Sequence, residues 1–102
     1  MIDLFQGDII KIGGFKSLFM IVSNNAFIQA TGVFHVCPVL ENVSDGPLHI
    51  CIEGIKGTKG TVLCEQIKLI DPEARNCRRL DRLPYGTVMD ISDALQGIFE
   101  YD

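Results

Sequence analysis

The sequence predicts a mainly β protein that folds as a small, strongly bent antiparallel barrel with a helix at its C-terminal end. Two observations carry this prediction. Short apolar stretches rich in β-branched and aromatic residues fill the first two-thirds of the chain, and turn-forming residues separate them at short intervals. The last part of the chain instead has apolar residues at helical spacing.

The first two expected strands are short and lie close together in the sequence. Residues 7–12 form the first strand, and Gly13 and Gly14 form a tight turn after it. Residues 17–23 are nearly all apolar, which is typical of a strand that is buried on both faces. The sequence therefore predicts a hairpin at the start of the fold.

A short helix is expected between the second and third strands. Asn24 or Asn25 can cap a helix over residues 26–30, and Gly32 stands beyond its end. Residues 33–39 then read as the third strand, which closes at a proline.

The second half of the chain alternates strands with turns. Residues 48–53 alternate in character, so Leu48, Ile50 and Ile52 share one face of a strand. The further elements expected are strands over residues 61–63 and 66–70, a helical turn over 71–75, a strand over 78–83 and a helix over 84–99. The apolar stripe expected on that helix is Val88, Ile91, Leu95, Ile98 and Phe99.

Composition bounds the class of protein. With 102 residues, of which 47% are hydrophobic, the chain is expected to form one domain over residues 1–102. No charge-free run approaches the roughly 18 residues that a bilayer-spanning helix needs. The expected location is therefore the cytoplasm, with no membrane association.

The four cysteines predict neither a metal site nor a disulfide. They are Cys37, Cys51, Cys64 and Cys77, and no two are spaced as C-x-x-C. They are interpreted as small buried hydrophobic residues in a reducing compartment. No cofactor is expected.

Charge is unevenly distributed along a chain whose net charge is −4. Residues 66–82 carry five basic and three acidic side chains, whereas residues 83–102 carry four acidic side chains and no basic one. The basic segment can follow a nucleic-acid backbone, bind an acidic peptide, or form a solvated face that offsets the acidic tail. Its arginines are Arg75, Arg78, Arg79 and Arg82.

Several segments, in order, resemble the MazF/PemK family of growth inhibitors, the toxin halves of bacterial type II toxin–antitoxin pairs. Residues 7–9 read Gly-Asp-Ile, residues 19–24 resemble the second strand of the family, and residues 60–71 give the closest match. The resemblance implies an SH3-like, half-open barrel of the MazF/PemK/CcdB type, a homodimer, and an antitoxin peptide and single-stranded RNA as partners. Members of the family cleave single-stranded RNA without a metal, with the RNA 2′-hydroxyl as nucleophile.

The chain departs from the family at its two catalytic positions. The family has an arginine followed by proline at the start of the second strand, where this chain has Ser17-Leu18. It has a threonine just after the third strand, where this chain has Leu40 or, with a one-residue slip, Glu41. A serine hydroxyl carries no charge to stabilise a developing phosphorane, so the resemblance implies an attenuated or inactive protein that acts by binding.

Two alternatives remain open. The first is an active, metal-independent endoribonuclease whose catalytic groups have moved to Lys16, Ser17 and Glu41. The second is a structural or regulatory dimer with no role in nucleic-acid binding.

Candidate nucleic-acid contacts come from the matched motif and from the basic segment. Glu65 and Gln66 match a family motif near the RNA groove, and such side chains can bond the base edges of a splayed strand. The alternative is a strand bend with two exposed polar groups. The full set of candidates is Glu65, Gln66, Arg75, Arg78 and Arg79.

Overall fold

The computed structural model describes residues 2–102, which form seven strands and two helices. The strands are β1 (Asp8–Ile12), β2 (Leu18–Ile21), β3 (Phe34–Leu40), β4 (His49–Glu53), β5 (Lys59–Leu63), β6 (Lys68–Ile70) and β7 (Cys77–Arg82). The helices are α1 (Asn25–Thr31), inserted between β2 and β3, and α2 (Tyr85–Ile98) at the C-terminal end. The predicted fold class, with a short inserted helix and a C-terminal helix, is confirmed.

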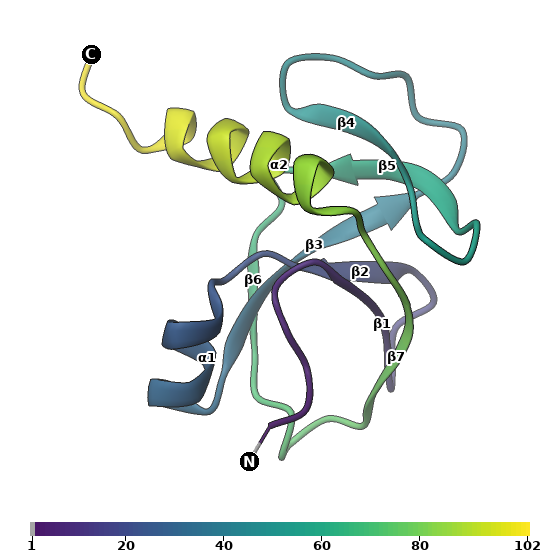
Figure 1. Ribbon diagram of the computed structural model, residues 1–102, viewed down its shortest axis with the longest axis vertical. Helices are drawn as coiled ribbons and strands as arrows, with labels where there is room; N and C mark the ends of the chain where they lie inside the picture. The colour runs from purple at the N-terminus through teal and green to yellow at the C-terminus, as the bar shows by residue number, and fades with distance from the viewer. Residues whose placement is uncertain (1) are drawn as a thin grey trace.

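The strands form one antiparallel, strongly bent sheet in the order β4-β5-β3-β2-β1-β7, with β6 also paired to β3 (Figure 1). Strand β3 is the centre of this arrangement, because residues 34–36 pair with β6 and residues 39–40 pair with β5. Pro38, which has no N–H to donate, lies between these two paired parts. The two end strands, β4 and β7, are not paired with each other, so the barrel is half-open.

Successive side chains of the central strands point into two different cores. Ile9 and Met20 belong to the first core, which the apolar face of α2 covers. Ile10 and Phe19 belong to the second core, which α1 and the N-terminal segment cover. Both faces of β1 and β2 are therefore buried, which explains their nearly continuous apolar sequence.

The ends of α1 follow the predicted capping pattern. The Asn24 side chain accepts a hydrogen bond of 2.8 Å from the Phe27 N–H, so Asn24 is the N-cap. Gly32 ends the helix with a φ of 76°, in the left-handed region that favours glycine.

Residues 71–75 form a single turn, as expected, in which the N–H groups of Ala74 and Arg75 bond back to the Asp71 carbonyl. Two other expectations differ from the structure. The stripe on α2 buries only its first part, and the Phe99 side chain beyond the helix is 75% exposed. Cys51 is exposed rather than buried, because it lies on the outer face of β4.

No helix within residues 2–102 is both long enough and apolar enough to cross a bilayer.

Candidate functional site

A pocket of about 340 Å³ lies where the β1–β2 loop meets the end of β3 and the start of β5. It brings together all three residues proposed from the sequence as relocated catalytic groups. The lining residues are Lys16, Ser17, Leu18, Val39, Leu40, Glu41 and Lys59. The two positions at which the chain departs from the MazF/PemK pattern, although distant in the sequence, therefore share one pocket.

The pairing register of the sheet explains this convergence. Leu18 at the start of β2 pairs with Val39, so Ser17 lies beside the residues that follow Val39. Leu40 in turn pairs with Thr61 of β5, which brings the start of β5 to the same place. The pocket is thus built at one end of three adjacent strands.

The charged groups of the pocket are not paired with each other. Among residues 2–102, none of the three ion pairs involves Lys16, Glu41 or Lys59. Two ammonium groups and one carboxylate give the lining a formal charge of +1, and these three side chains belong to exposed residues. Ser17 adds a neutral hydroxyl, and Leu40 adds no polar group.

Lys59 is the pocket residue that sequence reasoning missed. The sequence places it in a glycine- and lysine-rich loop, whereas the structure extends β5 back to residue 59, opposite Glu53 of β4. Only the pairing of β5 with its neighbouring strands shows that Lys59 lines the same pocket as Leu40. The amino-acid sequence around Lys59 does not indicate this.

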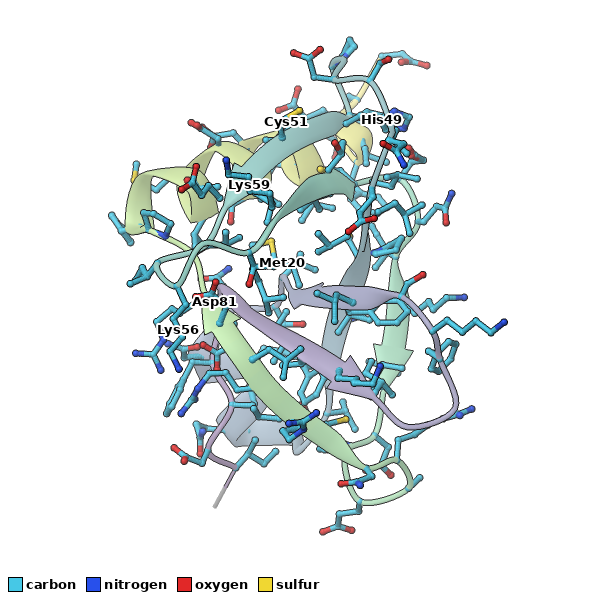
Figure 2. The ribbon with its side chains drawn as sticks, turned by 90° about the vertical axis from the view of Figure 1, so that its right-hand side faces the viewer. Met20, His49, Cys51, Lys56, Lys59 and Asp81 are labelled. Atoms are coloured by element: carbon cyan, nitrogen blue, oxygen red, sulfur yellow. The ribbon has the colours of Figure 1, made fainter. Side chains whose placement is uncertain are left out.

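A buried carboxylate holds the hairpin that carries Lys59. Asp81 of β7 is 2% exposed and accepts hydrogen bonds from the Lys56 N–H at 2.9 Å and the Thr58 N–H at 3.1 Å. Figure 2 shows Asp81 and Lys56 at the same end of the β4–β5 hairpin, with Lys59 further along it. Burial alone would raise the pKa of Asp81, but hydrogen bonds from the Thr58 hydroxyl and from the N–H groups of Lys56, Arg82 and Thr58 lower its pKa to about 2.

Glycine 54 permits this close approach. A Cβ atom at Gly54 would lie 2.1 Å from Oδ2 of Asp81, so no side chain fits there. The Ile55 N–H also donates to the Arg82 carbonyl at 2.8 Å. The hairpin tip is therefore attached to β7 across the opening of the sheet.

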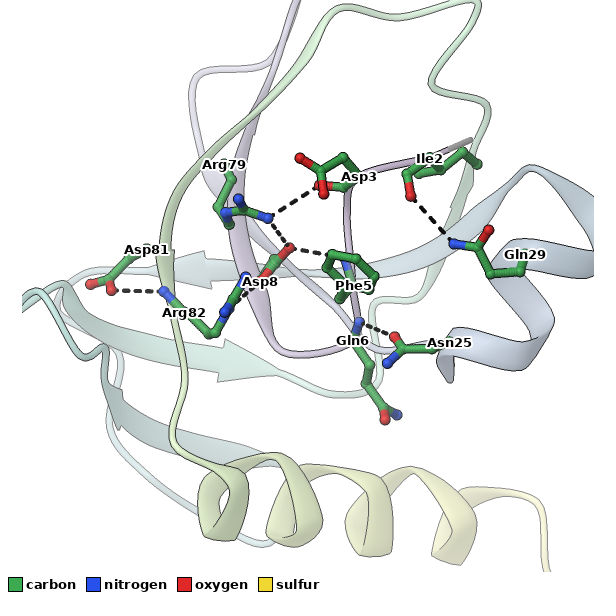
Figure 3. Close-up of polar contacts among 10 residues, drawn as sticks. All are labelled: Ile2, Asp3, Phe5, Gln6, Asp8, Asn25, Gln29, Arg79, Asp81 and Arg82. Carbon is green, nitrogen blue, oxygen red and sulfur yellow. Dashed lines mark hydrogen bonds and ion pairs between the residues drawn. The ribbon is translucent and has the colours of Figure 1, made fainter.

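A second buried carboxylate forms ion pairs with two arginines of the basic segment (Figure 3). Asp8 is fully buried and accepts from Nη1 of Arg79 and from Nε of Arg82, each at 3.1 Å. Arg79 also donates to the Asp3 carbonyl, at 3.1 Å. Arg79, a candidate nucleic-acid contact, thus already holds the N-terminal segment and β1 in place.

Arg75 and Arg78 have other surroundings. The guanidinium of Arg75 lies 5.0 Å from the centroid of the Phe15 ring, a cation–π geometry that ties the 71–76 turn to the β1–β2 loop. Arg78 is exposed and lies opposite Lys11 of β1, so these two cations share the outer surface of the sheet edge.

Glu65 and Gln66 lie away from the pocket that contains Lys16 and Lys59, which we call the lysine pocket. Glu65 contacts His49, with Nε2 of the histidine 2.5 Å from Oε1 and 3.2 Å from Oε2 of the carboxylate. This pair borders a separate, smaller pocket that shares no lining residue with the lysine pocket. Gln66 is exposed in the turn between β5 and β6.

The cysteines differ in environment. Burial, together with the nearby Cys64 and Glu65, raises the pKa of the Cys37 thiol to about 12, so this thiol stays protonated and unreactive.

Within residues 2–102 no three or more histidine, cysteine, aspartate or glutamate side chains cluster as a metal site would require.

Comparison with known families gives a match over almost the whole chain. The family model described as PemK-like, MazF-like toxin of type II toxin–antitoxin systems matches residues 6–99. A search of curated protein sequences gave no match.

Solved structures show the same fold at low sequence identity. A MazE–MazF complex from Deinococcus radiodurans aligns with a TM-score of 0.81 at 19% identity, covering 97% of this chain and 97% of that one. An endoribonuclease from a mycobacterial species gives a TM-score of 0.81 at 18% identity, covering 95% and 91%. A mycobacterial endoribonuclease in complex with its cognate antitoxin gives 0.78 at 17% identity, covering 97% and 99%.

Proposed function

Because this chain belongs to the PemK-like, MazF-like toxin family of type II toxin–antitoxin systems, we propose that it acts by binding single-stranded RNA or an antitoxin peptide, with RNA cleavage attenuated or absent. It acts as a single domain over residues 1–102 and as a homodimer. This function needs no cofactor.

The observation that carries the proposal is the content of the pocket shared by Ser17 and Leu40. Attack of a 2′-hydroxyl on phosphorus needs a strong donor or cation on the phosphate and groups that move two protons. Ser17 offers a neutral hydroxyl there and Leu40 offers nothing polar. A lysine nearby is a point charge and cannot reproduce the planar, two-pronged contact of an arginine with a phosphate.

Known relatives support an antitoxin as the partner. The Deinococcus protein was crystallised with MazE, and one mycobacterial endoribonuclease was crystallised with its cognate antitoxin. The exposed cations Lys11 and Arg78 on the edge of the sheet suit an acidic peptide.

Glu41 gives a specific reason to keep active cleavage as the second candidate. In that reaction the Glu41 carboxylate removes the proton from the 2′-hydroxyl, whose oxygen then bonds to phosphorus. The bond between phosphorus and the 5′-oxygen breaks, and Lys16 or Lys59 donates a proton to that leaving oxygen. The products are a 2′,3′-cyclic phosphate and a free 5′-hydroxyl.

Expression in a host that lacks an antitoxin, followed by primer extension on total RNA, tests the proposal. We expect normal growth and no new RNA ends from a protein shown to be folded and soluble. In vitro, the purified protein should retain salt-sensitive binding to an RNA oligonucleotide, with or without EDTA.

Growth arrest with discrete new RNA ends would contradict the proposal. Loss of those ends in Glu41→Gln, together with no cleavage of a 2′-deoxy strand of the same sequence, would establish the second candidate. If RNA stays intact and the protein binds neither RNA in a salt-sensitive way nor an antitoxin, the remaining hypothesis is the structural or regulatory dimer.

A further inference from the structure

Among residues 2–102, neither of the two lysines that line this pocket, Lys16 and Lys59, forms an ion pair with an acidic side chain. We propose that Lys16 and Lys59 together form a binding site for one phosphodiester group of single-stranded RNA. This inference rests on the proposed function and assigns the residues that provide its phosphate contact. Lys59 has no role in the resemblance from which the other candidates came.

The position of Lys59 is fixed by close packing on both sides. On one side, the N–H groups of Lys56 and Thr58 donate to the buried carboxylate of Asp81. On the other side, a Cβ at Gly60 would lie 2.7 Å from Cγ1 of Val39 and 3.2 Å from the Leu40 carbonyl. Strand β5 therefore presses directly against the end of β3, and Lys59 is held at the edge of the pocket.

The loop that carries Lys16 is also attached to its surroundings. The Gly13 N–H donates to the Asn76 carbonyl at 2.7 Å, and Phe15 lies under the Arg75 guanidinium. Phe15 additionally contacts Phe19 edge to face, with ring centroids 5.3 Å apart. Because both backbones are held, only the two flexible side chains must be ordered when an anion binds.

The acidic neighbours leave the lysines available. Glu53 lies opposite Lys59 in the β4–β5 pairing and Glu41 lines the pocket, yet neither forms an ion pair with Lys16 or Lys59. A phosphodiester carries one negative charge, which matches the formal charge of +1 on the pocket lining.

Glu41 favours a ribonucleotide over an acidic peptide at this place. A ribonucleotide has hydrogen-bond donors beside its phosphate, namely the 2′-hydroxyl and the base amines, that a carboxylate can accept. A run of acidic side chains would instead place further carboxylates against Glu41.

The test measures binding of a fluorescein-labelled single-stranded RNA oligonucleotide by anisotropy at several salt concentrations. Lys16→Gln and Lys59→Gln should each weaken binding about tenfold. Together they should reduce the salt slope by about 0.7, the contribution of one phosphate of a single strand. Lys59→Arg should restore most of the affinity, because it keeps the charge. Lys68→Gln, which removes an exposed lysine on β6, is the matched control and should change the affinity much less.

RNA binding that is unchanged in both pocket variants would overturn the phosphate site while leaving the proposed function in place. If the unmodified protein binds no RNA, the RNA-binding part of the proposed function fails, and amide NMR with inorganic phosphate then decides the inference. Shifts at Ser17 and Lys59 that disappear in Lys59→Gln would support the site, and their absence would overturn it. Displacement of those signals by an oligoglutamate peptide but not by RNA would assign the pocket to an acidic peptide and also overturn it.

Discussion

Two buried carboxylates, Asp8 and Asp81, do different structural work in this protein. Asp8 neutralises two arginine side chains that reach it from β7. Asp81 is bonded instead to backbone N–H groups of the β4–β5 hairpin. The first holds charge inside the fold, and the second holds a turn in one conformation.

Asp81 should make stability depend on pH below about 4. Its pKa is about 2 in the folded protein and near 3.9 in the unfolded chain, so folding favours the ionised form. This stabilisation, about 2 kcal/mol, is fully present above pH 4 and is lost as the pH falls toward 2. Urea unfolding between pH 7 and pH 2 measures it.

Asp81→Asn should remove this part of the pH dependence and lower stability at pH 7. Asp93→Asn, on the exposed side of α2, is the matched control and should keep the pH profile. Equal pH profiles for the unmodified protein and Asp81→Asn would show that the carboxylate does not hold the hairpin.

The candidate site also shows the limits of the sequence at the residue scale. Lys16, Ser17 and Glu41 could be found from the sequence, because they stand at or beside the family's catalytic positions. Lys59 could not, since its nearness to Leu40 depends on how β5 pairs with β3. That Arg79 holds Asp8, 71 residues away in the chain, likewise has no local signal.

At the scale of elements, two glycines associated with α2 differ in the space around them. Gly7 packs against the helix, whereas Gly97 lies within it and is open to solvent. Gly7 precedes β1 with a φ of 91°, and a Cβ there would lie 2.7 Å from Cγ2 of Val88 in α2. Gly97 lies near the end of α2, and a Cβ at that position would meet no other atom within 4 Å.

Alanine at these two glycines should therefore have opposite effects. Gly97→Ala should stabilise the protein by up to about 1 kcal/mol, because alanine has the higher helix propensity. Gly7→Ala should destabilise it by about 2 kcal/mol, through backbone strain and the clash with Val88. Thermal unfolding of the two variants checks both signs, and a stabilised Gly7→Ala would contradict the close packing of α2 against this turn.

Elements with strong local signals were predictable. The caps of α1 and the apolar runs of β1 and β2 place those elements nearly at their observed bounds. Asp71 and Pro72 suit a helix start, and residues 71–75 form the single turn that they predict before β7 begins at Cys77.

At the scale of the whole molecule, large apolar side chains remain exposed at several places, including Ile55 between β4 and β5 and Leu69 on β6. Met89 and Phe99 are 48% and 75% exposed, and they lie within or just beyond α2. Large apolar side chains that remain exposed are available to a protein interface.

The proposed homodimer is expected to persist in dilute solution. Light scattering coupled to gel filtration should give twice the chain mass of 11.3 kDa over a wide concentration range. A mass of one chain at every concentration would rule out the dimer, whereas RNA binding by the lysine pocket would remain testable.

The pairing of Asp8 with β7 has a consequence for how the polypeptide matures during synthesis. Asp8 is made 71 and 74 residues before Arg79 and Arg82, the two arginines that neutralise it. Until then its carboxylate stays hydrated, and β1 cannot enter the interior without burying an uncompensated charge. A nascent chain that ends before Arg79 therefore lacks the finished sheet, and this fold can close only after Arg79 and Arg82 have been added.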